Sequence, residues 1–175
     1  PRLLHISGVA GIGKSRLIRE LSKYLDGLTE TTYWHAGRCP SYGEGVSFWA
    51  LTEMVRGRAR IAESDEPDMA RRKLAACLAE HISDADERRW IEPRLGYLLG
   101  LEAAPSGERD ELFGAWRRFF ERVAERGTVA LVVEDLQWAD PGLMDFLESL
   151  LESSRTSPIL VLTLARPELM DRRPG

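Results

Sequence analysis

The chain has 175 residues, of which 43% are hydrophobic and 30% charged, and it carries a formal net charge of −4. This size and composition fit one globular domain, and the acidic balance argues against direct nucleic-acid binding as its main task. Because no apolar run approaches the ~18 residues of a membrane span, and the two cysteines are too few for a disulfide framework, we expect a cytoplasmic protein without a membrane segment.

Four apolar runs predict strands, and they span residues 3–7, 31–37, 129–134 and 159–164. The last two runs, VALVVE and ILVLTL, show no polar alternation. Continuous apolar runs of this length are typical of strands that are buried on both faces of a parallel sheet.

Helical periodicity fills the intervals between these runs. Helices are predicted over residues 14–25, 46–56, 68–81, 87–99 and 108–126, and a further one is opened by Asp140 as cap and Pro141 at its first position. Pro93 is expected to break or restart the fourth of these helices.

Strands that alternate with helices predict a three-layer α/β fold with right-handed crossovers, formed as a single domain over residues 1–175. About 90 residues separate the second and third strands, too many for one crossover. We expect residues 46–126 to form a mostly helical insertion within the same domain.

A glycine-rich loop between the first strand and the first helix carries the strongest functional signal. It matches G-x-x-x-x-G-K-[ST] at every fixed position, and the predicted nucleotide-binding residues are Gly8, Val9, Ala10, Gly11, Ile12, Gly13, Lys14, Ser15 and the following Arg16. The glycines let backbone N–H groups point inward at a helix N-terminus, which favours anions. The Lys14 ammonium is placed against the outer phosphates, and the Ser15 hydroxyl is offered to Mg²⁺.

The third strand ends in two adjacent acids, Glu134 and Asp135. Ligands bind at the carboxyl edge of such sheets, and a P-loop protein that hydrolyses a nucleoside triphosphate needs carboxylates there. We assign Glu134 to the Mg²⁺ shell and Asp135 to the attacking water, with an exchange of the two roles left open. An Asp is usual at the place that Glu134 occupies, and Glu is longer by one methylene group.

The fourth strand runs into Arg166. If this strand lies beside the P-loop strand, either Arg166 or Thr163 is a candidate to reach the γ-phosphate, where an arginine distinguishes a triphosphate from a diphosphate by charge. The alternative is an ordinary surface arginine at a strand end.

Four segments together resemble a known family: GVAGIGKSR, YGEGVSFW, VVEDLQWAD and LTLARPEL. They are similar to the ATPase domain of the STAND branch of P-loop ATPases, related to AAA proteins. Such domains follow class III adenylate/guanylate cyclase domains and occur in large LuxR-type transcription regulators. The resemblance implies an ASCE-type P-loop NTPase fold with strand order 5-1-4-3-2, in which the strands seen here are the first four and the fifth is missing.

The same resemblance implies ATP and Mg²⁺ as ligands, Arg166 as a γ-phosphate sensor, and cyclase or regulator domains and helical repeats as fused partners. Its adenine-contacting segment precedes the P-loop strand and its helical lid follows the fifth strand. We therefore expect weak nucleotide binding by the sequence from Pro1 to Gly175 alone. The preference for ATP over GTP rests on the resemblance, since the sequence has no guanine-specific Asn-Lys-x-Asp stretch.

Several nearby residues receive lesser roles. Asp140 is expected to cap a helix, Trp138 to pack, and Gln137 is a minor candidate for contact with the attacking water. The stretch from Tyr42 to Gly45 predicts a turn. Because the second strand would lie at the sheet edge, Arg38 is not expected to touch ATP.

Three functions stay open on the sequence alone. The leading interpretation is a regulatory ATPase domain that acts as a nucleotide-dependent switch and slowly hydrolyses ATP. One alternative is a small-molecule phosphotransferase whose acceptor pocket lies in the helical insertion. The other is a scaffold that binds nucleotide without hydrolysing it. This alternative stays open because Glu134 stands where the usual pattern has an Asp.

Overall fold

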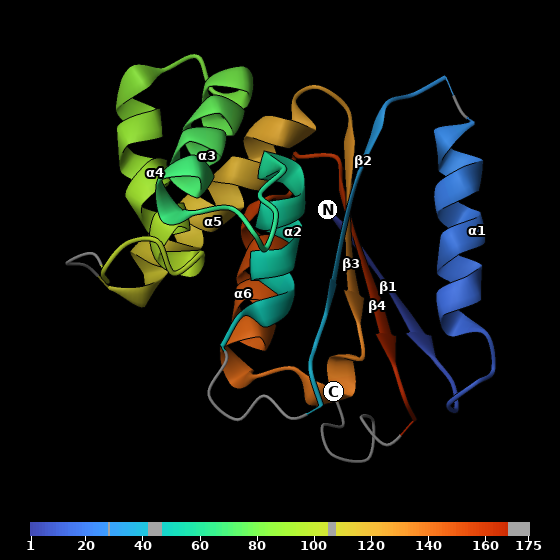
Figure 1. Ribbon diagram of the computed structural model, residues 1–175. Helices are drawn as coiled ribbons and strands as arrows, with labels where there is room; N and C mark the ends of the chain where they lie inside the picture. Colours follow the sequence, from blue (N-terminus) through green and yellow to red (C-terminus); the bar gives the residue numbers. More distant parts are fainter. Residues whose placement is uncertain (28, 42–46, 105–107, 168–175) are drawn as a thin grey trace.

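The structure is a computed structural model that describes residues 1–27, 29–41, 47–104 and 108–167. Its four strands are β1 (Arg2–Ser7), β2 (Thr32–Arg38), β3 (Thr128–Glu134) and β4 (Ile159–Ala165). Its helices are α1 (Lys14–Asp26), α2 (Trp49–Ala59), α3 (Pro67–His81), α4 (Ala85–Leu98), α5 (Arg109–Ala124) and α6 (Pro141–Ser153), with a short 3₁₀ turn, η1 (Leu136–Trp138), after β3 (Figure 1).

The strands form one parallel sheet in the order β1-β4-β3-β2. All four predicted strands are confirmed, and so is the α/β fold with a parallel sheet. The register pairs Ser7 with Ala165 and Arg38 with Glu134. The carboxyl ends of all four strands therefore meet at one edge of the sheet, where the P-loop and the acid pair also lie.

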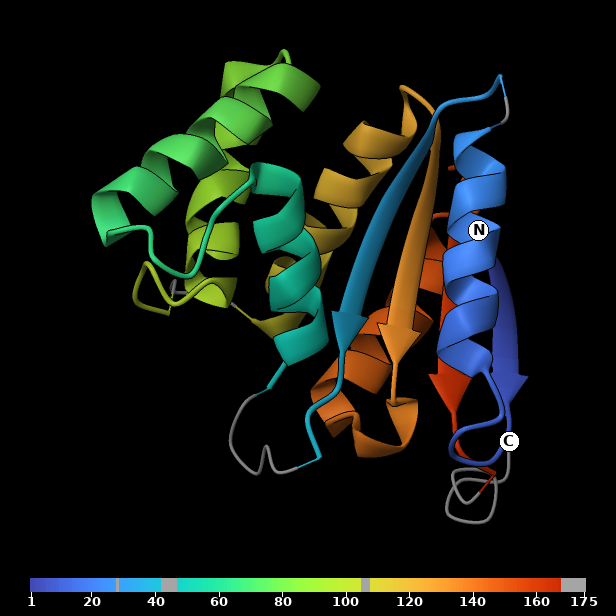
Figure 2. The ribbon, with the colours of Figure 1, turned by 45° about the vertical axis from the view of Figure 1, so that its right-hand side comes forward.

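Helices cover both faces of the sheet and make three layers. Helix α1 lies alone on one face, and α2, α5 and α6 lie on the other, with α3 and α4 outside them (Figures 1 and 2). Under α1 the core is small: Ile18 packs with Val132, Leu162 and Leu164. The P-loop helix is thus held by a minor core, and the helices between β2 and β3 belong to the major one.

The major core lies between the sheet and α2–α6. Helix α5 supplies its largest side chains at helical spacing, with Trp116, Phe119 and Phe120 fully buried. Alternate residues of β3, such as Leu131, face this cluster, while Val132 faces α1. A strand that is buried on both faces explains the unbroken apolar run in the sequence.

Strand β2 and helix α2 approach each other unusually closely. A Cβ atom at Gly37 would lie 2.0 Å from the carbonyl oxygen of Ala50. Only glycine on the strand, opposite the small Ala50, lets the two backbones touch. This contact fixes α2 directly behind the carboxyl end of β2.

Pro93 does not break its helix, so that prediction is wrong. Helix α4 runs continuously from Ala85 to Leu98 with Pro93 inside it. The proline removes one N–H donor from the ladder, but Pro93 and Arg89, whose carbonyl loses its partner, are both exposed. Water can reach the freed carbonyl, and burial of Ile91 and Leu95 holds the helix in place. No helix within the described residues is long and apolar enough to cross a membrane.

Candidate nucleotide-binding site

The P-loop connects β1 to α1 along the carboxyl edge of the sheet. Gly8 N donates to the carbonyl of Ala165 at 3.2 Å, which ties the start of the loop to β4. Gly11 and Gly13 have φ angles of 79° and 107°, in the region that favours glycine. No side chain caps the N-terminus of α1. Its first N–H groups therefore lack an intrahelical partner and suit an anion.

The Lys14 ammonium lies over this loop. Its Nζ donates to the carbonyl oxygens of Gly8 and Val9, at 2.5 and 3.1 Å. A lysine that contacts only carbonyl dipoles can exchange them for the stronger attraction of phosphate oxygens. The loop thus suits a polyphosphate, with a turn built on left-handed glycines, a helix start without a side-chain cap and a lysine ammonium beside it.

The Ser15 hydroxyl and the Glu134 carboxylate meet across the sheet edge. Ser15 Oγ donates to Glu134 Oε2 at 2.7 Å, although the two residues are 119 positions apart. A hydroxyl beside a carboxylate is the kind of oxygen pair that Mg²⁺ accepts, usually together with phosphate oxygens and water. Among the described residues no group of three or more His, Cys, Asp or Glu side chains is arranged to hold a metal ion.

Asp135 takes a left-handed backbone conformation, with φ of 56°, as the chain turns from β3 into η1. Aspartate tolerates this conformation better than most residues. Gln137 Nε2 donates to Asp135 Oδ1 at 3.3 Å, and Gln137 Oε1 accepts from Arg166 N at 3.1 Å. The Gln137 amide therefore links the acid at the end of β3 to the arginine after β4.

Strand β4 does lie beside β1, as the argument for Arg166 required. Arg166 is exposed and lines a pocket with Asp135. Thr163 is buried, and its Oγ1 lies 2.9 Å from His5 Nδ1 within the sheet. Of the two candidates in this strand, only Arg166 reaches the site edge.

Sequence reasoning missed Arg38. Its Nη2 lies 3.5 Å from Glu134 Oε2 and its Nε lies 3.6 Å from Asp135 Oδ2. The signal for this contact is the sheet order: in a 1-4-3-2 sheet, β2 is the neighbour of β3, so the ends of these strands are adjacent. The position of β2 at the sheet edge, beside β3, brings Arg38 next to the acids.

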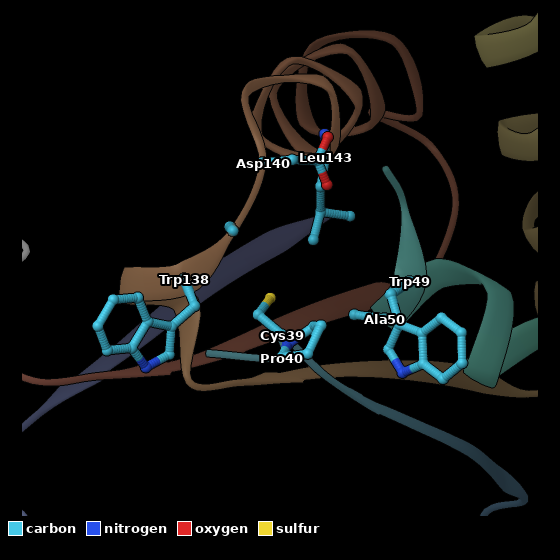
Figure 3. Close-up of a pocket in the computed structure, with 8 residues that line it drawn as sticks. Cys39, Pro40, Trp49, Ala50, Trp138, Asp140 and Leu143 are labelled. Atoms are coloured by element: carbon cyan, nitrogen blue, oxygen red, sulfur yellow. The ribbon is translucent and has the colours of Figure 1, made fainter. Parts of the chain in front are cut away.

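A pocket of about 310 Å³ opens beside the acid pair. Its lining residues are Arg38, Cys39, Pro40, Ser41, Trp49, Glu53, Asp135, Trp138 and Arg166. Figure 3 shows a smaller neighbouring pocket that shares four of these residues, with Trp49 and Trp138 on either side of Cys39 and Pro40. Trp138 is 41% exposed. The expected packing of Trp138 is therefore partial, and the residue lines the pocket as well.

Burial raises the pKa of the Cys39 thiol to about 12, and the nearby carboxylates of Asp140, Asp135 and Glu53 act in the same direction. A thiol held in its protonated form is a poor nucleophile. The buried Cys39 is therefore a part of the pocket wall with low nucleophilicity.

Asp140 caps α6 as predicted, accepting from Leu143 N at 3.1 Å. It also accepts from Phe48 N at 2.9 Å, immediately before α2. Two of the segments noted in the sequence, YGEGVSFW and VVEDLQWAD, thus meet through one carboxylate. The predicted turn from Tyr42 to Gly45 lies outside the described residues.

Comparison with known proteins agrees with this geometry. The family model described as AAA ATPase domain matches residues 1–162. A curated relative, the uncharacterized protein R02095 of Rhizobium meliloti (strain 1021), is 28% identical over 170 residues, which is 93% of this chain and 16% of that protein. The chain thus spans a small part of the relative's length. With a P-loop, an acid pair at the end of β3 and a matching family model over most of its length, the chain belongs to the AAA ATPase domain family and is a nucleotide-binding ATPase domain.

Proposed function

We propose that this domain is a regulatory ATPase that binds ATP with Mg²⁺, hydrolyses it slowly, and acts as a nucleotide-dependent switch. The observation that carries the proposal is the 2.7 Å contact between the Ser15 hydroxyl and the Glu134 carboxylate. It joins the end of the P-loop to the end of β3. This is the juxtaposition that phosphoryl transfer to water requires.

Each residue then has a defined role. The Lys14 ammonium leaves the carbonyls of Gly8 and Val9 to neutralise the outer phosphates. Ser15 and Glu134 would hold Mg²⁺, which when bound supplies positive charge against the phosphate oxygens. The Asp135 carboxylate orients the attacking water and accepts its proton.

Exposure of the acids supports slow hydrolysis. The Glu134 side chain is 21% exposed and that of Asp135 is 41% exposed. Exclusion of water strengthens the electrostatic interactions of a site and protects a transferred phosphoryl group from hydrolysis. An acid pair open to solvent favours reaction with water, at a low rate, over transfer to an acceptor.

The phosphotransferase alternative has one observation in its favour, the pocket of about 310 Å³ that adjoins Asp135. An acceptor bound there would lie beside the Asp135 carboxylate. Equal amounts of ADP and free phosphate in the product would exclude transfer, whereas ADP in excess of phosphate would reveal an acceptor.

The switch role is supported by Gln137. Its amide contacts both Asp135 and the backbone of Arg166. If Arg166 contacts the γ-phosphate, hydrolysis removes that contact. The change at Arg166 then reaches Gln137, which is hydrogen-bonded to the water-orienting acid Asp135. We further propose that such a switch controls cyclase or transcription-regulator domains and helical repeats in a longer chain, consistent with the greater length of the relative.

Calorimetric titration of ATP and of GTP, each with Mg²⁺, tests nucleotide binding. We expect weak binding of ATP by the 175-residue chain, loss of that binding in Lys14→Ala, and wild-type binding in Lys23→Ala. Lys23 is the matched control, since it lies on the same helix, is 72% exposed and pairs only locally with Glu20. Lys14→Ala binding ATP as well as the wild type would remove the basis of the proposal.

Phosphate release tests hydrolysis separately. Asp135→Asn is expected to lower the rate by about 100-fold or more, the scale of losing a general base, with ATP affinity retained. A wild-type chain that binds ATP but releases no phosphate would replace the ATPase proposal with the scaffold alternative.

A further inference from the structure

One guanidinium bridges the two acids of the site. Arg38 is the register partner of Glu134, and its side chain reaches Glu134 Oε2 through Nη2 and Asp135 Oδ2 through Nε, at 3.5 and 3.6 Å. Two adjacent carboxylates repel each other, and a cation shared between them holds both in a defined direction.

The backbone of Arg38 is fixed, while its side chain is exposed and held, among the described residues, by the two carboxylates alone. Arg38 N donates to Glu53 Oε2 on α2 at 2.7 Å, and Cys39 N donates to the carbonyl of Glu134 at 2.9 Å. The Arg38 side chain is 63% exposed and lines the pocket beside the acids. The guanidinium can therefore leave one carboxylate without any movement of the strand.

Glu134 is contacted from two directions, by the Ser15 hydroxyl and by the Arg38 guanidinium on the same atom, Oε2. A divalent cation held by Ser15 and Glu134 would meet that guanidinium at close range. Like charges repel, so Arg38 opposes the cation at Glu134 while it continues to hold Asp135.

From these contacts we propose that Arg38 is a positioning residue with two separable effects, an inference that rests on the proposed ATPase function. It orients the Asp135 carboxylate for the attacking water, and it competes with the divalent cation for Glu134. Removal of the guanidinium then tightens Mg²⁺ binding and slows hydrolysis at the same time. Simple damage to the fold would weaken both.

The first measurement needs no catalysis. Mg²⁺ is titrated into the chain with a non-hydrolysable ATP analogue, and the fluorescence of the nearby Trp49 and Trp138 reports binding. Arg38→Ala is expected to lower the apparent Kd for Mg²⁺ by about three- to fivefold, the scale of losing an exposed charge contact. Arg38→Lys keeps the charge and is expected to stay within about twofold of the wild type.

The second measurement is the rate of phosphate release at saturating Mg²⁺ and ATP. Arg38→Ala is expected to lower kcat by about tenfold. Arg38→Lys is expected to lower kcat as well, because an ammonium cannot bridge both acids as the planar guanidinium does. The lysine variant therefore separates charge from geometry.

Arg155→Ala is the matched control. It removes the same charge from an exposed arginine that precedes β4, at the opposite edge of the sheet. We expect wild-type values in both measurements for this variant. An equal change in Arg155→Ala would overturn the proposal, because the effect would then come from net charge alone.

The outcomes distinguish this inference from the function on which it rests. A wild-type chain that binds no analogue overturns both. A chain that binds the analogue, with an Arg38→Ala variant whose Mg²⁺ affinity is unchanged or weaker, overturns the competition. An Arg38→Ala variant with a wild-type kcat overturns the positioning role and leaves the ATPase proposal standing.

Discussion

Asp140 offers a direct test of how the start of α2 and the start of α6 are joined. One oxygen caps α6 through Leu143 N at 3.1 Å, and the other accepts from Phe48 N at 2.9 Å. Phe48 has a φ of 61°, and its ring packs on Trp116 with centroids 4.9 Å apart. The carboxylate thus holds a left-handed residue in the place that lets α2 begin.

The cost of losing this carboxylate has two parts. Loss of a helix cap costs about 1 kcal/mol, and a partly buried N–H left without a partner costs about 1–3 kcal/mol. We therefore expect Asp140→Ala to lower the free energy of unfolding by about 3 kcal/mol, which corresponds to a fall in Tm of about 6–12 °C for a chain of this size.

Asp140→Asn and Asp140→Ser separate the two parts. Asparagine and serine cap helices about as well as aspartate, so each of these variants keeps the bond to Leu143 N. Each lacks the second acceptor, and we expect a loss of about 1–2 kcal/mol from the free Phe48 N–H. Urea unfolding, followed by circular dichroism and tryptophan fluorescence, measures all three variants.

Two results would refute the reasoning. If Asp140→Ala lies within about 0.5 kcal/mol of the wild type, the scale of an ordinary surface substitution, the carboxylate is not a tether. If Asp140→Asn is as unstable as Asp140→Ala, the cap contributes nothing measurable.

Three further expectations concern stability. Gly37→Ala should cost about 3 kcal/mol, because its Cβ would lie 2.0 Å from the Ala50 carbonyl oxygen, whereas Gly57→Ala, with open space around it, should gain about 0.5–1 kcal/mol in the same urea titration. Burial, with a nearby arginine, lowers the pKa of His35 to about 4. As the pH drops from 6.5 to 4, His35 is protonated in the unfolded chain before it is protonated in the folded chain. The free energy of unfolding should therefore fall by about 3 kcal/mol over this range. His35→Phe should flatten that dependence in unfolding curves measured across the range, and an equal slope in the variant would assign the loss to other groups. Pro93→Ala should raise the Tm by several degrees, because alanine restores a donor in an exposed helix interior and is favoured over proline by about 3 kcal/mol; a lower Tm would show that the proline is needed.

The strands and the P-loop could be predicted from sequence because their signals are local. β3 is an unbroken apolar run, and the loop has fixed spacing between a strand and a helix. The start of α2 could not be predicted in this way. A helix from residue 46 was expected, yet the helix begins at Trp49, because Phe48 is held in a left-handed conformation by Asp140, 92 positions away.

In the site, too, local sequence patterns predict some contacts, and contacts between distant parts of the chain decide the others. The Ser15–Glu134 contact follows from the P-loop pattern and the acid at the strand end. Arg38 carries no such pattern, and its role depends on which strand lies next to β3. Trp138 is hydrophobic and was expected to pack, but no local signal says that a short 3₁₀ turn leaves its indole 41% exposed.

The close approach at Gly37 has a mechanical consequence. Side chains between a strand and a helix act as a compliant layer that absorbs small displacements, and this layer is absent where Gly37 meets Ala50. We therefore expect strand β2 and helix α2 to move together at this point. A displacement of α2 would then reach Arg38, the residue that follows Gly37, through a direct backbone contact.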